Sequence, residues 1–198
     1  MVTILEKHID ATLETTALIE SIKLDSGQLF VIKYFNTLFE KINSLNINSN
    51  IINKFFFKNN NIIKGIYLFG GVGRGKSMLM DLFFQNVDIK EKRRLHFHDF
   101  MKEVHQRVLE KSKVERNKDC VLLVAKDLAK SAKLLCFDEM EVRDIADAMI
   151  LSRLFEVMFK EGTVLVTTSN QPPEGLYKNG LHRDRILPFI QNLKLKTD

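Results

Sequence analysis

A glycine-rich segment that ends in a lysine and a serine, residues 70–77, has the residue types that most clearly indicate chemistry. It reads GGVGRGKS, follows the apolar, β-favouring run 66–69 and precedes a helix-favouring run. Glycines let main-chain N–H groups turn inward and approach a charged group closely. The start of a helix adds unpaired N–H groups and the positive end of its dipole. This spacing between a strand and a helix predicts a P-loop that binds phosphate groups.

The residue types of this loop suit a nucleoside triphosphate with Mg²⁺. Lys76 can reach the β- and γ-phosphates, and the hydroxyl of Ser77 can bind Mg²⁺. A glycine-rich turn that matches the pattern by chance is the alternative, and the flanking strand and helix patterns disfavour it. The predicted nucleotide-binding residues are Gly70, Gly71, Val72, Gly73, Arg74, Gly75, Lys76, Ser77 and Met78.

Two adjacent acids, Asp138 and Glu139, follow an unbroken apolar run. Such a run is typical of a buried parallel strand whose carboxyl end borders a ligand. Asp138 would then hold Mg²⁺, while Glu139 would orient and polarise the attacking water. The alternative is a helix N-cap, because Asp144 and a helical run follow closely. Asn170 follows the next strand and would face the same crevice, where it could contact the γ-phosphate or its water.

The whole chain suits one α/β domain of parallel strands with helices on both faces. We expect a helical N-terminal extension with an asparagine-rich connection over residues 1–61 and a P-loop core over residues 62–198. The predicted strands are 66–69, 94–98, 134–138 and 163–168, and the predicted helices are 2–22, 28–45, 100–114, 119–132, 145–159 and 186–195.

Composition narrows the class of protein. The net charge of +5 comes mostly from scattered lysines, so nucleic-acid binding is compatible with it but not favoured. Cys120 and Cys136 lack the spacing of a zinc or disulfide framework, which indicates a reducing compartment. The first residues do not resemble a signal peptide, and no apolar run could span a bilayer. We therefore expect the cytoplasm, or the surface of a membrane without a transmembrane segment.

Two further groups of side chains have alternative interpretations. His96 and His98 would share one face of the strand 94–98, but no cysteine or carboxylate is well placed to complete a zinc site. Asp25, Gln28 or Tyr34 could contact adenine, because the segment before a P-loop often borders the base. Packing against the core is the favoured interpretation for these three residues.

Five segments in this order resemble the cell division protein ZapE family, AAA+ ATPases with mitochondrial relatives. They read GIYLFGGVGRGKSMLMDLFF, RRLHFHDFM, LLCFDEMEVRDIADAMILSRLF, VLVTTSNQPPEGLY and GLHRDRILPFI. The resemblance covers about residues 64–190 and is specific, because five separate motifs occur in order.

The resemblance implies hydrolysis of ATP with Mg²⁺, ring-forming homo-oligomers and a role at the bacterial inner membrane during division. The mitochondrial relatives are linked to protein quality control. Position by position, Lys76 and Ser77 match the family's Walker A pair, Asp138 and Glu139 match its Walker B pair, and Asn170 matches sensor 1.

The resemblance also makes predictions for the last third of the chain. Arg183 falls where the family's arginine finger is expected, with Arg185 as the rival, and a finger acts on a neighbour's γ-phosphate. Met140 replaces an aromatic residue, a change we expect to be tolerated. Family members continue past the position of Asp198 into a fifth strand and a helical lid. Without these, residues 66–69 would form an open edge, and the lid would be absent.

The leading hypothesis is therefore a Mg²⁺-dependent ATPase that remodels a protein partner, in the division machinery or at the membrane. One alternative is a nucleotide-binding module with little hydrolysis. A second alternative, suggested by the basic charge balance, is a loader-like ATPase that acts on single-stranded DNA.

Overall fold

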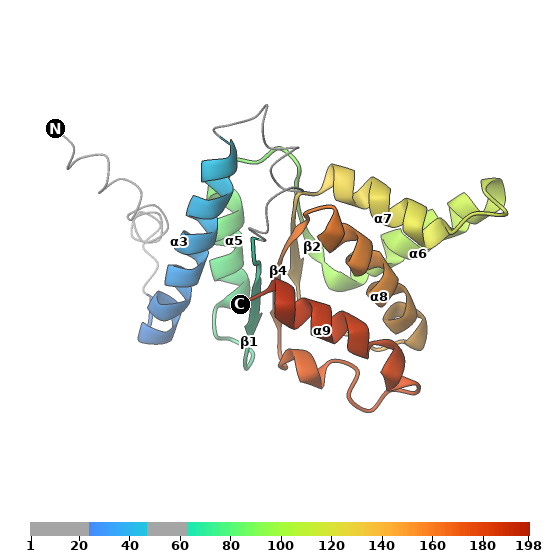
Figure 1. Ribbon diagram of the computed structural model, residues 1–198. Coiled ribbons are helices and arrows are strands. Elements are labelled where there is room, and N and C mark those ends of the chain that lie inside the picture. The colour runs from blue at the N-terminus through green and yellow to red at the C-terminus, as the bar shows by residue number, and fades with distance from the viewer. Residues whose placement is uncertain (1–23, 47–62) are drawn as a thin grey trace.

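A parallel β-sheet with helices on both faces forms the body of the molecule (Figure 1). The computed structural model describes residues 24–46 and 63–198. Within them the strands are β1 (Ile66–Phe69), β2 (Lys92–His96), β3 (Leu134–Asp138) and β4 (Val164–Ser169), in the sheet order β1-β4-β3-β2. Every neighbouring pair is parallel. This is the α/β class that the sequence predicts, while the expected helix 2–22 and most of the asparagine-rich connection lie outside the described residues.

The helices form two layers. On one face lie α3 (Ser26–Asn46) and α5 (Lys76–Asn86), which stand side by side in Figure 1. The other face is covered by α6 (Phe97–Val114), α7 (Cys120–Ser131), α8 (Ile145–Lys160) and α9 (Leu187–Lys196). Two short 3₁₀ helices, η1 (Pro173–Gly175) and η2 (Arg183–Arg185), connect β4 to α9.

The central strand β3 explains why its sequence is apolar throughout. Leu134 and Cys136 pack on the side of α3 and α5, whereas Leu135 and Phe137 pack on the side of α6 to α9. Successive side chains of a strand point to opposite faces, so a strand covered on both faces must be apolar at every position. Cys136 is fully buried, and this burial raises the pKa of its thiol above the ordinary value.

The second strand is displaced from its predicted position. It ends at His96, and α6 begins at Phe97, so the expectation that the strand continues to His98 was wrong. The reason is the helical spacing of Phe97, Phe100 and Val104, all of which are buried. The rings of Phe97 and Phe100 contact the ring of Phe137, with centroids at 5.7 and 4.5 Å.

The outer edge of β1 is partly paired. Thr197 forms a parallel bridge with Gly65, and the Tyr67 N–H donates to the carbonyl of Asp198 at 3.0 Å. Toward the neighbouring strand β4, a Cβ at Gly65 would lie 1.7 Å from the carbonyl oxygen of Leu165, so only glycine allows the two strands to approach this closely. The open edge expected along the whole of β1 is therefore covered at its start. Among the helices of the described residues, none has the length and apolar character needed to cross a membrane.

Candidate active site

The P-loop connects the end of β1 to the first turn of α5. Gly75 has a φ of 74°, and a Cβ there would lie 2.6 Å from the side-chain nitrogen of Gln28, so this position favours glycine in two ways. The Lys76 ammonium donates to the carbonyls of Gly70 and Gly71, both at 2.8 Å, and to Asn170 Oδ1 at 3.3 Å. The structure thus brings Asn170, which directly follows β4, to the lysine of the loop.

The carboxylate of Asp138 lies against the other end of the same loop. Its Oδ1 accepts hydrogen bonds from Ser77 Oγ at 2.7 Å and from Thr168 Oγ1 at 2.6 Å. The side chain is only 8% exposed. Burial by itself would raise the pKa of Asp138, but the two hydroxyls and the nearby Arg94 guanidinium outweigh it and hold the pKa below its ordinary value. The site therefore presents a carboxylate oxygen of Asp138 directly beside the hydroxyl of Ser77.

Glu139 has an uncommon backbone conformation, with a φ of 55°. Its N–H donates to Thr168 Oγ1 at 3.0 Å, and the N–H of Met140 donates to the carbonyl of Thr168 at 2.7 Å. These bonds hold the left-handed residue in place, and the Glu139 side chain is exposed. A non-glycine residue in this region of φ is strained, and such strain is often found at functional sites.

A cleft of about 630 Å³ opens beside Glu139, and its lining contains no residue of the P-loop. Its lining includes His96, His98 and Arg143 as well as both acids. His105 also lines it, and its Nε2 lies 2.6 Å from an oxygen of Asp147. In the part of the chain that the structure describes, no three histidine, cysteine or acidic side chains converge to hold a metal ion.

The start of α3 contacts the P-loop directly. The helix begins at Ser26, two residues before the predicted start at residue 28, and Asp25 and Gln28 form reciprocal hydrogen bonds at its N-terminus. The Gln28 amide also donates to the carbonyl of Arg74 at 3.2 Å. Asp25 and Gln28 line a cleft of about 310 Å³ together with Gly70, Gly71 and Lys76. Tyr34 is absent from that lining and instead packs edge-on against Phe30.

Both candidate fingers lie in η2. The Arg183 guanidinium donates to the carbonyl of Glu174 at 2.5 Å, while its buried Nε has no hydrogen-bond partner among the described residues. Arg185 lies 3.6 Å from the carboxylate of Asp184 and is 65% exposed. Among the residues that the structure describes, the hydrogen bonds and ion pairs of these arginines do not include the P-loop or the two acids of the same chain.

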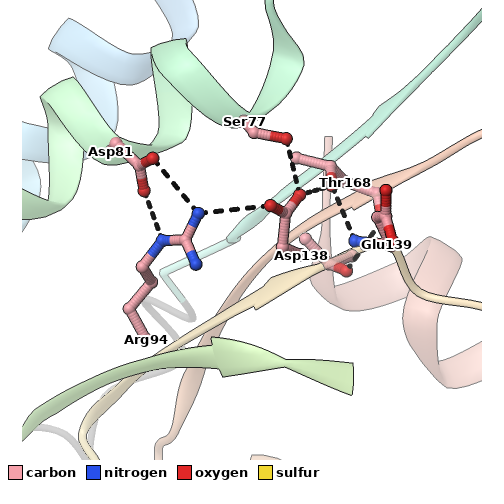
Figure 2. A network of polar contacts seen from close by, with 7 residues as sticks. Ser77, Asp81, Arg94, Asp138, Glu139 and Thr168 are labelled. Carbon is pink, nitrogen blue, oxygen red and sulfur yellow. Dashed lines mark hydrogen bonds and ion pairs between the residues drawn. The ribbon is translucent and has the colours of Figure 1, made fainter. Parts of the chain in front are cut away.

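Three residues that the sequence did not single out belong to the same polar network: Thr168, Arg94 and Asp81 (Figure 2). Thr168 lies near the end of β4, two positions before Asn170, and Asp81 lies one helical turn after Ser77. These spacings from the predicted site residues were the only features of the sequence that could have indicated Thr168 and Asp81. They become informative only once the order of the strands is known.

A family model for AFG1-like ATPases matches residues 11–198. The chain belongs to the AFG1-like ATPase family. Among its relatives, Lactation elevated protein 1 homolog B of Danio rerio is 50% identical over 139 residues, which is 66% of this chain and 28% of that protein. Cell division protein ZapE of Escherichia coli K12 is 46% identical over 136 residues, 69% of this chain and 36% of that protein. The resemblance to the ZapE family is thus confirmed.

The fold of this AFG1-like chain is that of P-loop AAA+ proteins. It matches AMPPCP-bound DnaA of Aquifex aeolicus with a TM-score of 0.56 over 88% of this chain and 46% of that one, at 13% sequence identity. Identity this low supports the fold alone. The chain spans only about a third of the length of the curated relatives, from 28% to 36%.

Proposed function

We propose that the chain binds ATP with Mg²⁺ at residues 70–78 and hydrolyses it to ADP and phosphate. The observation that carries the proposal is the 2.7 Å hydrogen bond between Ser77 Oγ and Asp138 Oδ1. It joins the helix that follows the P-loop to the strand that carries the acids. Hydroxyl and carboxylate oxygens are ligands that Mg²⁺ prefers, so Ser77 and Asp138 fit this ion. Membership of an ATPase family supports the same function.

The nucleotide-binding roles follow from the positions of the donors. Main-chain N–H groups of residues 70–75 and the ammonium of Lys76 would hold the β- and γ-phosphates. Lys76 now donates to two loop carbonyls, and a phosphate oxygen would offer it a charged acceptor instead. When bound, Mg²⁺ would neutralise charge that develops on the phosphates. Asn170 lies beside Lys76 and would contact the γ-phosphate or its water.

The hydrolytic step assigns one role to each remaining residue. Glu139 would orient a water molecule and accept its proton as the water oxygen bonds to the γ-phosphorus. The bond from that phosphorus to the bridging oxygen breaks, and ADP leaves. Arg183 from a neighbouring subunit would stabilise the charge on the transferred group, which makes the active form a homo-oligomer.

The wider role is proposed from the relative named as a cell division protein. Hydrolysis would drive a conformational change in a protein partner of the division machinery, in the cytoplasm or at the inner surface of the membrane. Residues 1–61 would form an extension of the core that spans residues 62–198, as the sequence predicts.

The experiment is phosphate release and nucleotide binding by the purified chain. Glu139→Gln keeps the shape of the side chain but removes the carboxylate, so turnover should fall by about 100-fold or more while ATP still binds. Lys76→Ala should instead weaken ATP binding. Glu156→Gln, an exposed change far along α8, is the matched control and should behave as wild type. Wild-type turnover in Glu139→Gln would refute the assignment.

A further inference from the structure

Arg94 on β2 connects the helix after the P-loop to the proposed metal ligand. Its guanidinium forms a bidentate ion pair with Asp81 on α5, through Nε to Oδ1 and through Nη2 to Oδ2 at 3.1 Å. The same Nη2 lies 3.2 Å from Oδ2 of Asp138. Figure 2 shows Arg94 between the two carboxylates, with Asp81 and Ser77 on the same face of α5.

This contact gives the two oxygens of Asp138 different partners. Oδ1 accepts hydrogen bonds from the hydroxyls of Ser77 and Thr168, and Oδ2 accepts one from the guanidinium of Arg94. A carboxylate bound at both oxygens inside the protein cannot rotate freely. Arg94 therefore fixes the plane of the carboxylate and leaves Oδ1 beside the hydroxyl of Ser77.

The charges around this contact oppose each other. A guanidinium beside Asp138 reduces the negative potential that would attract Mg²⁺, whereas Asp81 offsets that positive charge. The Arg94 side chain is 24% exposed and that of Asp81 39%, so water screens the pair only in part. The net charge offered to the metal thus depends on both members of the pair.

We propose that Arg94 is a positioning residue for the Mg²⁺-binding carboxylate, and that the Arg94–Asp81 pair sets the Mg²⁺ concentration required for nucleotide binding. This inference rests on the proposed function and extends it to two residues outside the nucleotide-binding loop and the two acids. A purely structural ion pair would contribute to stability without changing the Mg²⁺ requirement.

The test is a Mg²⁺ titration of the binding of a fluorescent ATP analogue to the purified chain. Asp81→Asn leaves the positive charge of Arg94 uncompensated, so the midpoint should rise about tenfold. Arg94→Gln removes the positive charge and leaves Asp81. The gain in negative potential should outweigh the freer rotation of Asp138 in Mg²⁺ binding, so the midpoint should fall, while turnover also falls because Asp138 is no longer held in one plane. The double variant should return to within about twofold of wild type, since the opposed charges are both removed.

The matched control is Arg93→Gln, one residue earlier on the same strand. Arg93 also forms a bidentate ion pair, with Glu103 at 3.0 and 2.5 Å, but that pair does not contact Asp138. Its loss should lower thermal stability to a similar degree and leave the Mg²⁺ midpoint unchanged. Thermal unfolding of each variant without nucleotide separates this structural effect from the metal effect.

Each outcome decides between the two proposals. If wild type binds the analogue but both single variants move the midpoint in the same direction or not at all, the inference is wrong and the proposed function stands. If wild type binds no nucleotide at any Mg²⁺ concentration, the proposed function fails and this inference with it. Should Arg94→Gln fail to fold, an unchanged midpoint in Asp81→Asn alone would overturn the inference.

Discussion

The backbone N–H of Glu139 donates to the side-chain hydroxyl of Thr168 at 3.0 Å. The same hydroxyl donates a hydrogen bond to Asp138 Oδ1, so one buried oxygen on β4 holds both neighbouring acids in position. Thr168 is only 1% exposed, and water cannot easily replace either bond. The relative placement of the two acids therefore depends on a residue that is itself neither a metal ligand nor a base.

Thr168→Val should damage both stability and turnover. It leaves the Glu139 N–H and one acceptor position of Asp138 unsatisfied, which should lower the free energy of unfolding by roughly 1–3 kcal/mol. Misplaced acids should reduce kcat by about 100-fold. Thr168→Ser keeps the hydroxyl and should stay close to wild type. Chemical denaturation and phosphate release measure the two effects, and full activity in Thr168→Val would contradict the prediction.

The left-handed backbone of Glu139 predicts that glycine at this position stabilises the fold even though it removes the carboxylate needed for turnover. Glycine at this position would relieve backbone strain of roughly 1–2 kcal/mol. It would also make the unfolded chain more flexible, which costs roughly 0.5–1 kcal/mol, so the net effect favours glycine. Glu139→Gly should therefore unfold with a free energy about 0.5–1 kcal/mol above that of Glu139→Gln. Both variants should lack turnover. Equal or lower stability of the glycine variant in urea denaturation would show that the surrounding contacts relieve the strain.

A finger that acts between subunits predicts complementation between two inactive variants. Lys76→Ala lacks a working loop but keeps Arg183, and Arg183→Ala has the opposite defect. Random mixing in a ring should restore about a quarter of wild-type activity, because that fraction of interfaces combines both intact residues. Phosphate release from the mixed and separate proteins is the measurement. Recovery only when Arg185→Ala replaces Arg183→Ala would assign the finger to Arg185 instead.

The N-terminus of α7 predicts a pH-dependent contribution to stability. Asp119 accepts the N–H of Leu122 at 3.1 Å, and this bond, with help from Arg153, lowers the pKa of Asp119 below its ordinary value of 3.8. Asp119→Ala should cost about 1 kcal/mol of unfolding free energy. Because the folded pKa is the lower one, the charge-dependent part is present above about pH 4 and is lost as the pH falls through the folded pKa.

The control for this prediction is Asp119→Asn. Asparagine also caps helices but does not titrate, so its stability should lack the acid-dependent part. Denaturation curves of the three proteins across acidic pH provide the comparison. A constant difference between wild type and Asp119→Asn on acidification would contradict the role of the charge.

The elements with strong local patterns were predictable from sequence. Strands β1 and β3 have the predicted bounds, and β4 (Val164–Ser169) is shifted by one residue, because apolar runs followed by polar residues specify buried parallel strands. The boundary at His96 was not predictable in the same way. The aromatic residues after it fit either period over a short window, and packing against Phe137 decides in favour of a helix.

The polar network around the acids was less predictable. Asp138 contacts residues that lie 61, 44 and 30 positions away, namely Ser77, Arg94 and Thr168. Such contacts depend on strand order and register, which hydrophobic pattern alone does not specify. The spacing of the motifs was enough to predict the P-loop and the two acids. The residues that hold Asp138 in place could be identified only from the strand register, which pairs His96 with Asp138.

The order β1-β4-β3 leaves one strand between the strand that leads into the P-loop and the strand that ends in the acids. Main-chain hydrogen bonds keep adjacent strands about 4.8 Å apart, so these two strands are separated by roughly 10 Å whatever side chains they carry. Substitutions of side chains can change the charge at this site, but the distance between the P-loop and the acids is set by the peptide backbone.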